Sequence, residues 1–161
     1  MKHVIAIANQ KGGVGKTTTA VNLSAALAAT KRSVLLIDLD PQGNASTAAG
    51  MKKNENTLYE IYSQNLLIND QILKSPSGYD VVPGGENLIA LEVLIRNEQK
   101  QGELKKQLKP LNYEFIIIDT PPSLNQLTLE SLFAASATLI PLQCEYYSLE
   151  GISSLINTIN T

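Results

Sequence analysis

The sequence predicts an α/β fold, a mostly parallel sheet with helices on both of its faces, and three observations lead to this prediction. Short apolar runs, typical of strands buried on both faces, alternate with segments of helical spacing from end to end. Strands separated by helices need crossover connections, which make neighbouring strands parallel. The glycine-rich stretch GGVGK follows the first apolar run and opens the first helical segment. We therefore expect three layers: helices, sheet and helices.

Five strands are predicted, each a short and mostly apolar run bounded by polar or turn residues. Two of these runs, VLLID and YEFIIID, end in aspartate. The run YDVVP ends at Pro83 and is followed by two glycines, which is a strong stop signal. The predicted strands are residues 4–8, 34–38, 79–83, 113–119 and 137–142.

Helical spacing occupies the segments between these strands. In NLIALEVLIRNEQK, three leucines and Ile95 recur on one helical face. Residues 100–109 carry lysines interleaved with Glu103, and we interpret them as a solvated helix rather than a DNA-binding patch. The predicted helices are residues 17–29, 57–67, 87–100, 127–136 and 148–161.

Composition and charge exclude several classes of protein. The 161 residues are 43% hydrophobic and 17% charged, which suits one domain with a buried core and not a disordered chain. The net charge of −2 gives no overall field that would hold nucleic acid or an anionic membrane. One cysteine and one histidine allow neither an internal disulfide nor a soft-metal cluster. No apolar run approaches the ~20 residues of a membrane span, so we expect a soluble protein of a reducing compartment.

The last predicted helix, residues 148–161, is amphipathic and is followed by neither a cap nor another strand. Its apolar face needs a neighbour that the preceding residues do not supply. We therefore predict that residues 1–161 are the N-terminal part of a longer single-domain protein.

The glycine-rich stretch has the residues of a phosphate-binding loop, with one departure from the standard pattern. G-x-x-x-x-G-K-[ST] requires a glycine where this chain has Gln10. That replacement removes nothing from the cradle of backbone amides that residues 12–18 offer to an anion. Lys16 is placed to reach the outer phosphates of a nucleotide, and the Thr17 hydroxyl to bind Mg²⁺. We interpret the loop as altered and still functional.

Aspartates follow two further strands at the edge where parallel sheets bind ligands. Asp38 and Asp40 stand at the end of the second predicted strand, and Asp119 ends the fourth after a run of isoleucines. An acidic residue in that place supports Mg²⁺ in phosphate-loop proteins. One aspartate at a strand end is a weak signal, because many of them cap helices. Together with the glycine loop, however, the three favour a nucleotide site.

Four motifs, in order along nearly the whole chain, resemble those of the ParA-type (Soj-like) chromosome- and plasmid-partitioning ATPases. They are KGGVGKTT, LLIDLDPQGNAS, FIIIDTPPS and PLQCEYYSLEG. K-G-G-x-G-K-[ST] is specific to the ParA/MinD group, whose Walker A motif is deviant, and D-x-D-P-Q-G-N points to its ParA side. The resemblance implies a P-loop NTPase fold of three layers and a P-loop ATPase domain over residues 1–161. Members are longer than this chain, in agreement with the prediction above.

The resemblance also implies an activity, slow hydrolysis of ATP to ADP and phosphate that is used as a dimer switch. The extra lysine, Lys11, would cross the dimer interface to the partner's ATP, and Asp40 would position the attacking water. The expected catalytic residues are thus Lys11, Lys16 and Asp40. The expected nucleotide-binding residues are Lys11, Gly12, Gly13, Val14, Gly15, Lys16, Thr17, Thr18, Asp119 and Glu145. The expected Mg²⁺ residues are Thr17, Asp38 and Asp119, with the two aspartates bonding the ion's waters.

The partners implied by the resemblance are a second copy of the chain, DNA and a third protein. The ATP-bound homodimer would bind DNA non-specifically, and a ParB-type centromere-binding protein would stimulate hydrolysis. This places the protein in the cytoplasm at the nucleoid and not on a membrane.

Two other functions stay open at this point. One is a MinD-like ATPase that positions division or other machinery on a membrane, although the DLDPQGN loop favours ParA. The other is a metabolic enzyme of related fold, such as an ATP-dependent ligase or a reductase component. The single cysteine counts against the reductase.

Overall fold

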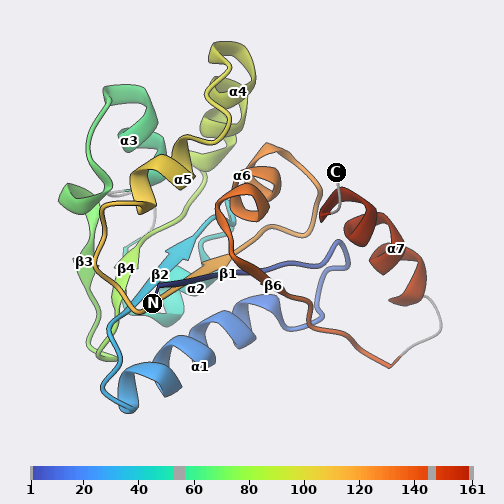
Figure 1. The fold of residues 1–161 in the computed structure, drawn as a ribbon, viewed down its shortest axis with the longest axis horizontal. Coiled ribbons are helices and arrows are strands. Elements are labelled where there is room, and N and C mark those ends of the chain that lie inside the picture. The colour runs from blue at the N-terminus through green and yellow to red at the C-terminus, as the bar shows by residue number, and fades with distance from the viewer. Residues whose placement is uncertain (1, 53–56, 145–147, 160–161) are drawn as a thin grey trace.

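A computed structural model describes residues 2–52, 57–144 and 148–159, and a six-stranded sheet runs through its middle (Figure 1). The strand order is β3-β4-β2-β5-β1-β6. All neighbouring pairs are parallel except β3 and β4, which are antiparallel. The strands are β1 (His3–Ile7), β2 (Val34–Asp38), β3 (Leu73–Lys74), β4 (Asp80–Val82), β5 (Phe115–Asp119) and β6 (Ala137–Leu139). The predicted fold class is confirmed.

Helices cover both faces of this sheet (Figure 1). Helix α1 (Lys16–Ala29) and the short α2 (Asn44–Ala48) pack on one face in a cluster with Ile7, Leu36 and Ile117. The opposite face carries a second cluster built around Leu35, Ile37 and Ile116. The helices on that side are α3 (Leu58–Gln64), α4 (Leu88–Glu98), α5 (Glu103–Leu108) and α6 (Gln126–Ala134). A 3-10 turn, η1 (Ile68–Gln71), and α7 (Ser148–Ile159) complete the described elements.

Strands β2 and β5 lie at the centre because their side chains suit burial on both faces. Every residue of β2 is buried, including its terminal Asp38. Strand β5 pairs with β1 on one side and with β2 on the other. The register sets Asp119 opposite both Ile7 and Asp38, so the ends of the three strands meet at one edge. This register brings the glycine loop and the aspartates together.

The elements that the sequence pattern did not indicate are short. Helix α2 follows the polar DPQG turn and has five residues, and β3 has two residues, too few to show a period. The last predicted strand was expected to reach residue 142, but β6 ends at Leu139. Pro141 has no N–H for a ladder hydrogen bond, which is a physical reason for the earlier end.

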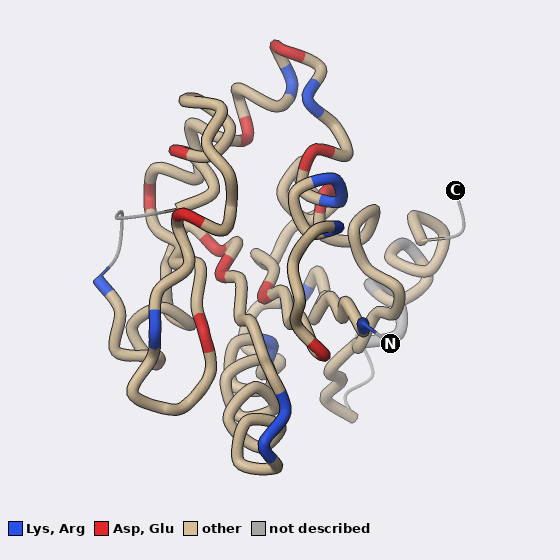
Figure 2. The backbone as a smooth tube through the Cα atoms, turned by 60° about the vertical axis from the view of Figure 1, so that its left-hand side comes forward, with Lys and Arg blue, Asp and Glu red and all other residues tan. Residues whose placement is uncertain are grey.

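Three of the four lysines in residues 100–109 contact an acidic or aromatic side chain. Figure 2 shows basic and acidic positions interspersed along the backbone. Lys100 pairs with Glu98 at 2.9 Å and Lys106 with Glu103 at 3.3 Å. The Lys105 ammonium lies 4.8 Å from the centre of the Phe133 ring. This segment therefore has the mixed charge of a solvated helix.

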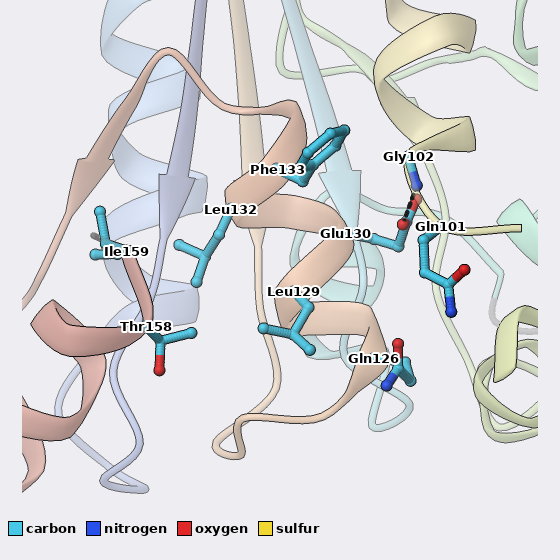
Figure 3. A pocket seen from close by; sticks show the side chains of 9 residues that line it. All are labelled: Gln101, Gly102, Gln126, Leu129, Glu130, Leu132, Phe133, Thr158 and Ile159. Carbon is cyan, nitrogen blue, oxygen red and sulfur yellow. Dashed lines mark hydrogen bonds between the residues drawn. The ribbon is translucent and has the colours of Figure 1, made fainter. Parts of the chain in front are cut away.

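A buried carboxylate, Glu130 of α6, holds three helices together and carried no signal in the sequence. Its side chain accepts hydrogen bonds from the Tyr62 hydroxyl at 2.9 Å and from the Leu104 backbone N–H at 3.2 Å. A third bond comes from the Gly102 backbone N–H (Figure 3). Glu130 is 4% exposed, so its three hydrogen bonds are largely shielded from bulk solvent. It thereby links α6 to α3 and to the start of α5.

Replacing Glu130 by alanine is expected to lower the free energy of unfolding by about 2 kcal/mol, because three buried donors lose their acceptor. Urea denaturation followed by circular dichroism measures this. Glu130→Gln keeps one acceptor oxygen and should lose less, and Glu98→Ala, at an exposed pair, should change little. A loss no greater than that of Glu98→Ala would show that Glu130 does not hold the helices.

Candidate phosphate-binding site

The candidate site lies at the carboxyl edge of β1, β5 and β2, where three loops leave the sheet. A hollow of about 370 Å³ opens there. Its walls come from the glycine loop after β1, the turn after β2 and the start of the loop after β5. The lining residues are Gly12, Gly13, Gly15, Lys16, Thr17, Thr18, Asp40, Gln42, Asn44 and Pro122. The predicted nucleotide edge is thus assembled from the predicted strands.

The glycine loop is shaped by backbone conformations that side chains rarely adopt. Gly13 and Gly15 have φ angles of 74° and 93°. An added Cβ at Gly12, Gly13 or Gly15 would meet nothing within 4 Å, so the backbone faces open space. Val14, 8% exposed, anchors the loop from below. The loop therefore offers bare backbone to the hollow, as an anion cradle requires.

Helix α1 begins directly at the loop, with Gly15 as N-cap and Lys16 as first residue. Its first turn holds no acidic side chain, so nothing opposes the positive end of the helix dipole. Lys16 is 7% exposed, and its ammonium donates to the Lys11 carbonyl oxygen at 3.1 Å. Burial lowers the pKa of Lys16, while Asp119 and Asp40 raise it. The Lys16 ammonium therefore lies inside the loop, close to where an anion would bind.

Thr17 and Asp119 join the loop to the end of β5. The Thr17 hydroxyl donates to Asp119 Oδ2 at 2.8 Å. Asp119 Oδ1 is buried and has no hydrogen-bond partner. Burial, and next the charge of Asp38, raise the pKa of Asp119 from 3.8 to about 7. A water molecule of a hydrated Mg²⁺ would donate the hydrogen bond that this buried carboxylate oxygen lacks, and the threonine hydroxyl beside it is a ligand of the kind that Mg²⁺ takes.

Thr17 and Asp119 fit an Mg²⁺ ion whose other ligands are phosphate oxygens and waters. Among residues 2–52, 57–144 and 148–159, no group of three or more His, Cys, Asp or Glu could hold a metal ion. Mg²⁺ commonly keeps several waters and takes few protein ligands when phosphates supply the others. The Thr17–Asp119 pair suits that arrangement, in which phosphate oxygens and waters complete the shell.

Asp38 lies beside Asp119, but the turn after β2 already uses its carboxylate. Oδ1 accepts from the Asp40 N–H at 3.1 Å, and Oδ2 accepts from the Ser46 N–H at 2.8 Å and the Ser46 hydroxyl at 2.6 Å. Burial raises the pKa of Asp38 to about 6, although the hydrogen bonds from Ser46 lower it. A Cβ at Gly84 would stand 2.8 Å from the Asp38 carboxyl carbon, so glycine is needed there. The structure thus shows Asp38 holding the turn; its contact with a metal-bound water stays a prediction.

Asp40 reaches the hollow from the wall opposite the glycine loop. Its Oδ1 accepts from the Gln42 backbone N–H at 2.9 Å, and the side chain is 8% exposed. Gln42 and Asn44 line the same wall and were not among the predicted site residues. The DPQGN motif contained both, but its spacing alone did not show which side chains would face the ligand. Glu145, expected at the partner's nucleotide, lies outside the described residues.

A second hollow, of about 390 Å³, lies between α6 and the end of α7 (Figure 3). Leu129, Leu132, Phe133 and Ile159 give it an apolar lining, and its one carboxylate, Glu130, is bonded to Gly102. This lining brings no second charged side chain to Glu130, in contrast to the hollow at the glycine loop, which Lys16 and Asp40 both line. Of the described helices, none has the length and apolar content to cross a membrane.

The raised pKa values of Asp119 and Asp38 predict how stability depends on pH in metal-free protein. Unfolded aspartates titrate near 3.9, so between about pH 4 and pH 7 the folded state binds more protons. These two groups therefore stabilise the fold at low pH, and that contribution is lost as pH rises through about 6 and 7. In EDTA, the free energy of unfolding of wild type should fall between pH 5.5 and 7.5 by on the order of 1 kcal/mol more than that of Asp119→Asn. Equal slopes for the two proteins in urea titrations would contradict the raised pKa.

Comparison with known proteins agrees with this geometry. Residues 2–161 match the family described as AAA domain. The chain is 48% identical over 164 residues to the chromosome partitioning protein ParA of Myxococcus xanthus, covering 98% of this chain and 58% of the relative. It is 46% identical over 166 residues to the sporulation initiation inhibitor protein Soj of Bacillus subtilis, covering 99% and 65%.

A solved structure, cobyrinic acid a,c-diamide synthase from Mycobacterium smegmatis with bound ADP and magnesium, matches with a TM-score of 0.93 and 35% identity. That match covers 99% of this chain and 67% of the other. The chain spans 58% and 65% of the two curated relatives. The resemblance to ParA-type proteins expected from the four motifs is confirmed. The chain therefore belongs to the AAA domain family and is most similar, among the named relatives above, to ParA and Soj.

Proposed function

We propose that this chain is the nucleotide-binding part of an Mg-ATP-dependent, dimerising ATPase that acts as a switch in chromosome or plasmid partitioning. The observation that carries the proposal is the joint placement of Lys16, Thr17 and Asp40 around one hollow, with the buried Asp119 accepting a hydrogen bond from Thr17. This set supplies a phosphate cation, an Mg²⁺ site and a water-positioning carboxylate. The names of the relatives at 46% and 48% identity support the cellular role.

The chain itself would form the phosphate and Mg²⁺ part of a longer single-domain protein. The coverage of 58% and 65% of the two relatives supports this extension of residues 1–161. In the longer protein we place the remaining adenine contacts and the DNA-binding surface beyond the described residues. We also propose a cytoplasmic location at the nucleoid, slow hydrolysis and stimulation by a ParB-type protein, all of which rest on the resemblance.

Binding would use groups that are already in position. The Lys16 ammonium, now on the Lys11 carbonyl oxygen, would pair with outer phosphate oxygens, and the bare amides of the glycine loop would hold the others. Thr17 would hold Mg²⁺, and Asp119 Oδ1 would accept a hydrogen bond from one of its waters, with Asp38 in support. The ion, when bound, neutralises charge that develops on the phosphates.

Hydrolysis would depend on Asp40 and on Lys11 from the partner. One oxygen of Asp40 is held by Gln42, which fixes the carboxylate so that the other can orient a water. Phosphoryl transfer depends mainly on positioning and charge stabilisation, which Lys16 and the partner's Lys11 would provide. Glu145 would add a contact to the partner's nucleotide.

Loss of the γ-phosphate would change the free energy of dimerisation enough to convert the dimer to monomers. Changing a monomer–dimer ratio from 1:99 to 99:1 takes about 5.5 kcal/mol. Two or three charge-assisted hydrogen bonds to that phosphate, at about 1.5–3 kcal/mol each, would supply it. Hydrolysis removes these bonds, and the dimer separates.

A metabolic enzyme is the second candidate, because the matched synthase shares the fold at 35% identity. Such an enzyme would bind a small substrate beside the nucleotide and need not dimerise through ATP. ATP-dependent dimerisation therefore separates the two functions.

Lys11→Ala in the full-length protein is expected to weaken ATP-dependent dimerisation about tenfold and to slow hydrolysis, because one charge-assisted bond across the interface is lost. Monomer affinity for Mg-ADP should stay within about threefold, since residues 12–18 form the cradle. Light scattering and calorimetry measure the two quantities.

The matched control is Lys109→Ala. It removes the same charge at the opposite end of β1, where the Lys109 carbonyl oxygen accepts from Lys2. It should behave as wild type in both measurements. Wild-type protein that hydrolyses ATP without dimerising would favour the enzyme function, and full dimerisation by Lys11→Ala would remove Lys11 from the interface.

A further inference from the structure

Two carboxamide side chains tie the glycine loop to the chain that leaves β6. Asn9 Nδ2 donates to the Pro141 carbonyl oxygen at 2.8 Å, and Asn9 Oδ1 accepts from the Lys11 N–H at 2.9 Å. From the other side, Gln143 Nε2 donates to the Gly13 carbonyl oxygen at 3.1 Å. We name residues 140–144 the exit segment. Asn9 and Gln143 thus make contacts in both directions between it and the loop.

Residues 142–144 of the exit segment are exposed. The parallel ladder between β1 and β6 stops with the bond from the Ala8 N–H to the Leu139 carbonyl oxygen at 3.1 Å. The Pro141 carbonyl oxygen and the Gln143 side chain bond this segment to the loop side. The position of the exit segment therefore depends on the conformation of the loop.

The hydrogen bonds of Asn9 and Gln143 also fix the orientation of two peptide groups in the glycine loop. A trans peptide is planar, so its N–H and C=O point in opposite directions. Because Gln143 takes the Gly13 carbonyl oxygen, the Val14 N–H is directed away from Gln143. Because Asn9 takes the Lys11 N–H, that amide is withdrawn from any ligand and the residue after Gln10 is fixed. Glycine at positions 12, 13 and 15 gives little resistance to rotation, so these outside bonds matter.

The carboxamide of Asn9 serves as donor and as acceptor at once. The side chain is 6% exposed, and it accepts a bond at one atom while donating at the other. An aspartate of the same shape would keep the acceptor for the Lys11 N–H but would set a carboxylate oxygen against the Pro141 carbonyl oxygen. Asn9→Asp therefore breaks the tie to the exit segment and leaves the start of the loop bonded.

We propose that Asn9 and Gln143 are positioning residues that couple ligand occupancy of the glycine loop to the order of the exit segment. The inference rests on the proposed function only in its choice of ligand, a nucleoside diphosphate with Mg²⁺. Phosphate oxygens that bind the amides of residues 12–18 restrict the Gly13–Val14 peptide that Gln143 holds, and Asn9 holds the Lys11 amide at the start of the same loop. The restriction then passes to residues 140–144 through two side-chain hydrogen bonds.

Hydrogen exchange of the full-length protein, with and without Mg-ADP, tests the coupling. In wild type, Mg-ADP should slow exchange about fivefold or more both in the loop and at the exit-segment amides. In Asn9→Asp, the loop should still be slowed, and the exit segment should change less than about twofold. Gln143→Ala removes the second tie from an exposed position that does not endanger folding, and it should give an intermediate result.

Asn22→Asp is the matched control, because it makes the same chemical change at an exposed amide, which donates to the Thr18 carbonyl oxygen at 2.8 Å within α1. It should keep the wild-type response. Calorimetry of Mg-ADP binding separates the two hypotheses: wild type that binds no Mg-ADP contradicts the proposed function. Wild type that binds with an unprotected exit segment, or Asn9→Asp and Gln143→Ala variants that bind and keep full protection, overturns the coupling.

Discussion

Hydrolysis of ATP by the full-length Asp40→Ala variant is expected to be about 100-fold slower than that of wild type, which is the usual size of a lost proton-transfer or water-positioning group. The ATP-bound dimer should accumulate, because Asp40 holds no phosphate. Asp40 suits this role since one oxygen is fixed by the Gln42 N–H and the side chain still lines the hollow. Phosphate release at saturating Mg-ATP and light scattering measure the two effects.

Asp40→Asn is the informative companion to that variant. It keeps an oxygen for the Gln42 N–H and so preserves the turn, but it lacks the charge. It should be slow like Asp40→Ala, whereas Asp70→Ala, at an exposed position on η1, should hydrolyse at the wild-type rate. A normal rate for Asp40→Asn would assign Asp40 to loop structure alone.

The affinity of the full-length Lys16→Ala variant for Mg-ATP is expected to fall about 100-fold, about 2.7 kcal/mol. Lys16 is the cation inside the glycine loop, and its ammonium is already buried next to the carbonyl oxygen that it would leave for phosphate. The loss corresponds to one or two charge-assisted bonds at about 1.5–3 kcal/mol each.

Calorimetric titration measures this affinity, and Lys109→Ala again serves as a control of equal charge. Thermal unfolding of the ligand-free variant should stay close to wild type, because burial already opposes the charge of Lys16. Unchanged affinity in Lys16→Ala would place the phosphates elsewhere.

The sequence indicated long elements and the motifs between them with good accuracy. The five predicted strands all exist, because runs such as VLLID and FIIID suit only a position buried on both faces. The loop GGVGK and the aspartates at the ends of β2 and β5 occur where a ligand edge was expected. Element type follows from local periodicity, and periodicity is a property of the sequence.

Short elements and strand ends were harder to predict from the sequence, because they depend on contacts with residues distant in the chain. Helix α2 has five residues and forms where Asp38 accepts bonds from Ser46, a contact across eight positions of the chain. Strand β6 ends at Leu139, before Pro141, whose carbonyl oxygen accepts a hydrogen bond from Asn9 and not from a neighbouring strand. Neither contact has a spacing that a periodic pattern shows.

The sequence by itself determined the fold class, the order of the main elements and the place of the glycine loop between β1 and α1, since these depend on local pattern and on motifs. The tertiary structure alone decided which atoms are engaged. It separated Asp38, whose oxygens are bonded to the turn, from Asp119, which keeps one oxygen unpartnered. It also brought Glu130 to the Leu104 N–H and Asn9 to the Pro141 carbonyl oxygen. The physical reason is that hydrogen bonding and burial are set by residues distant in the chain, which come together only when the sheet has formed.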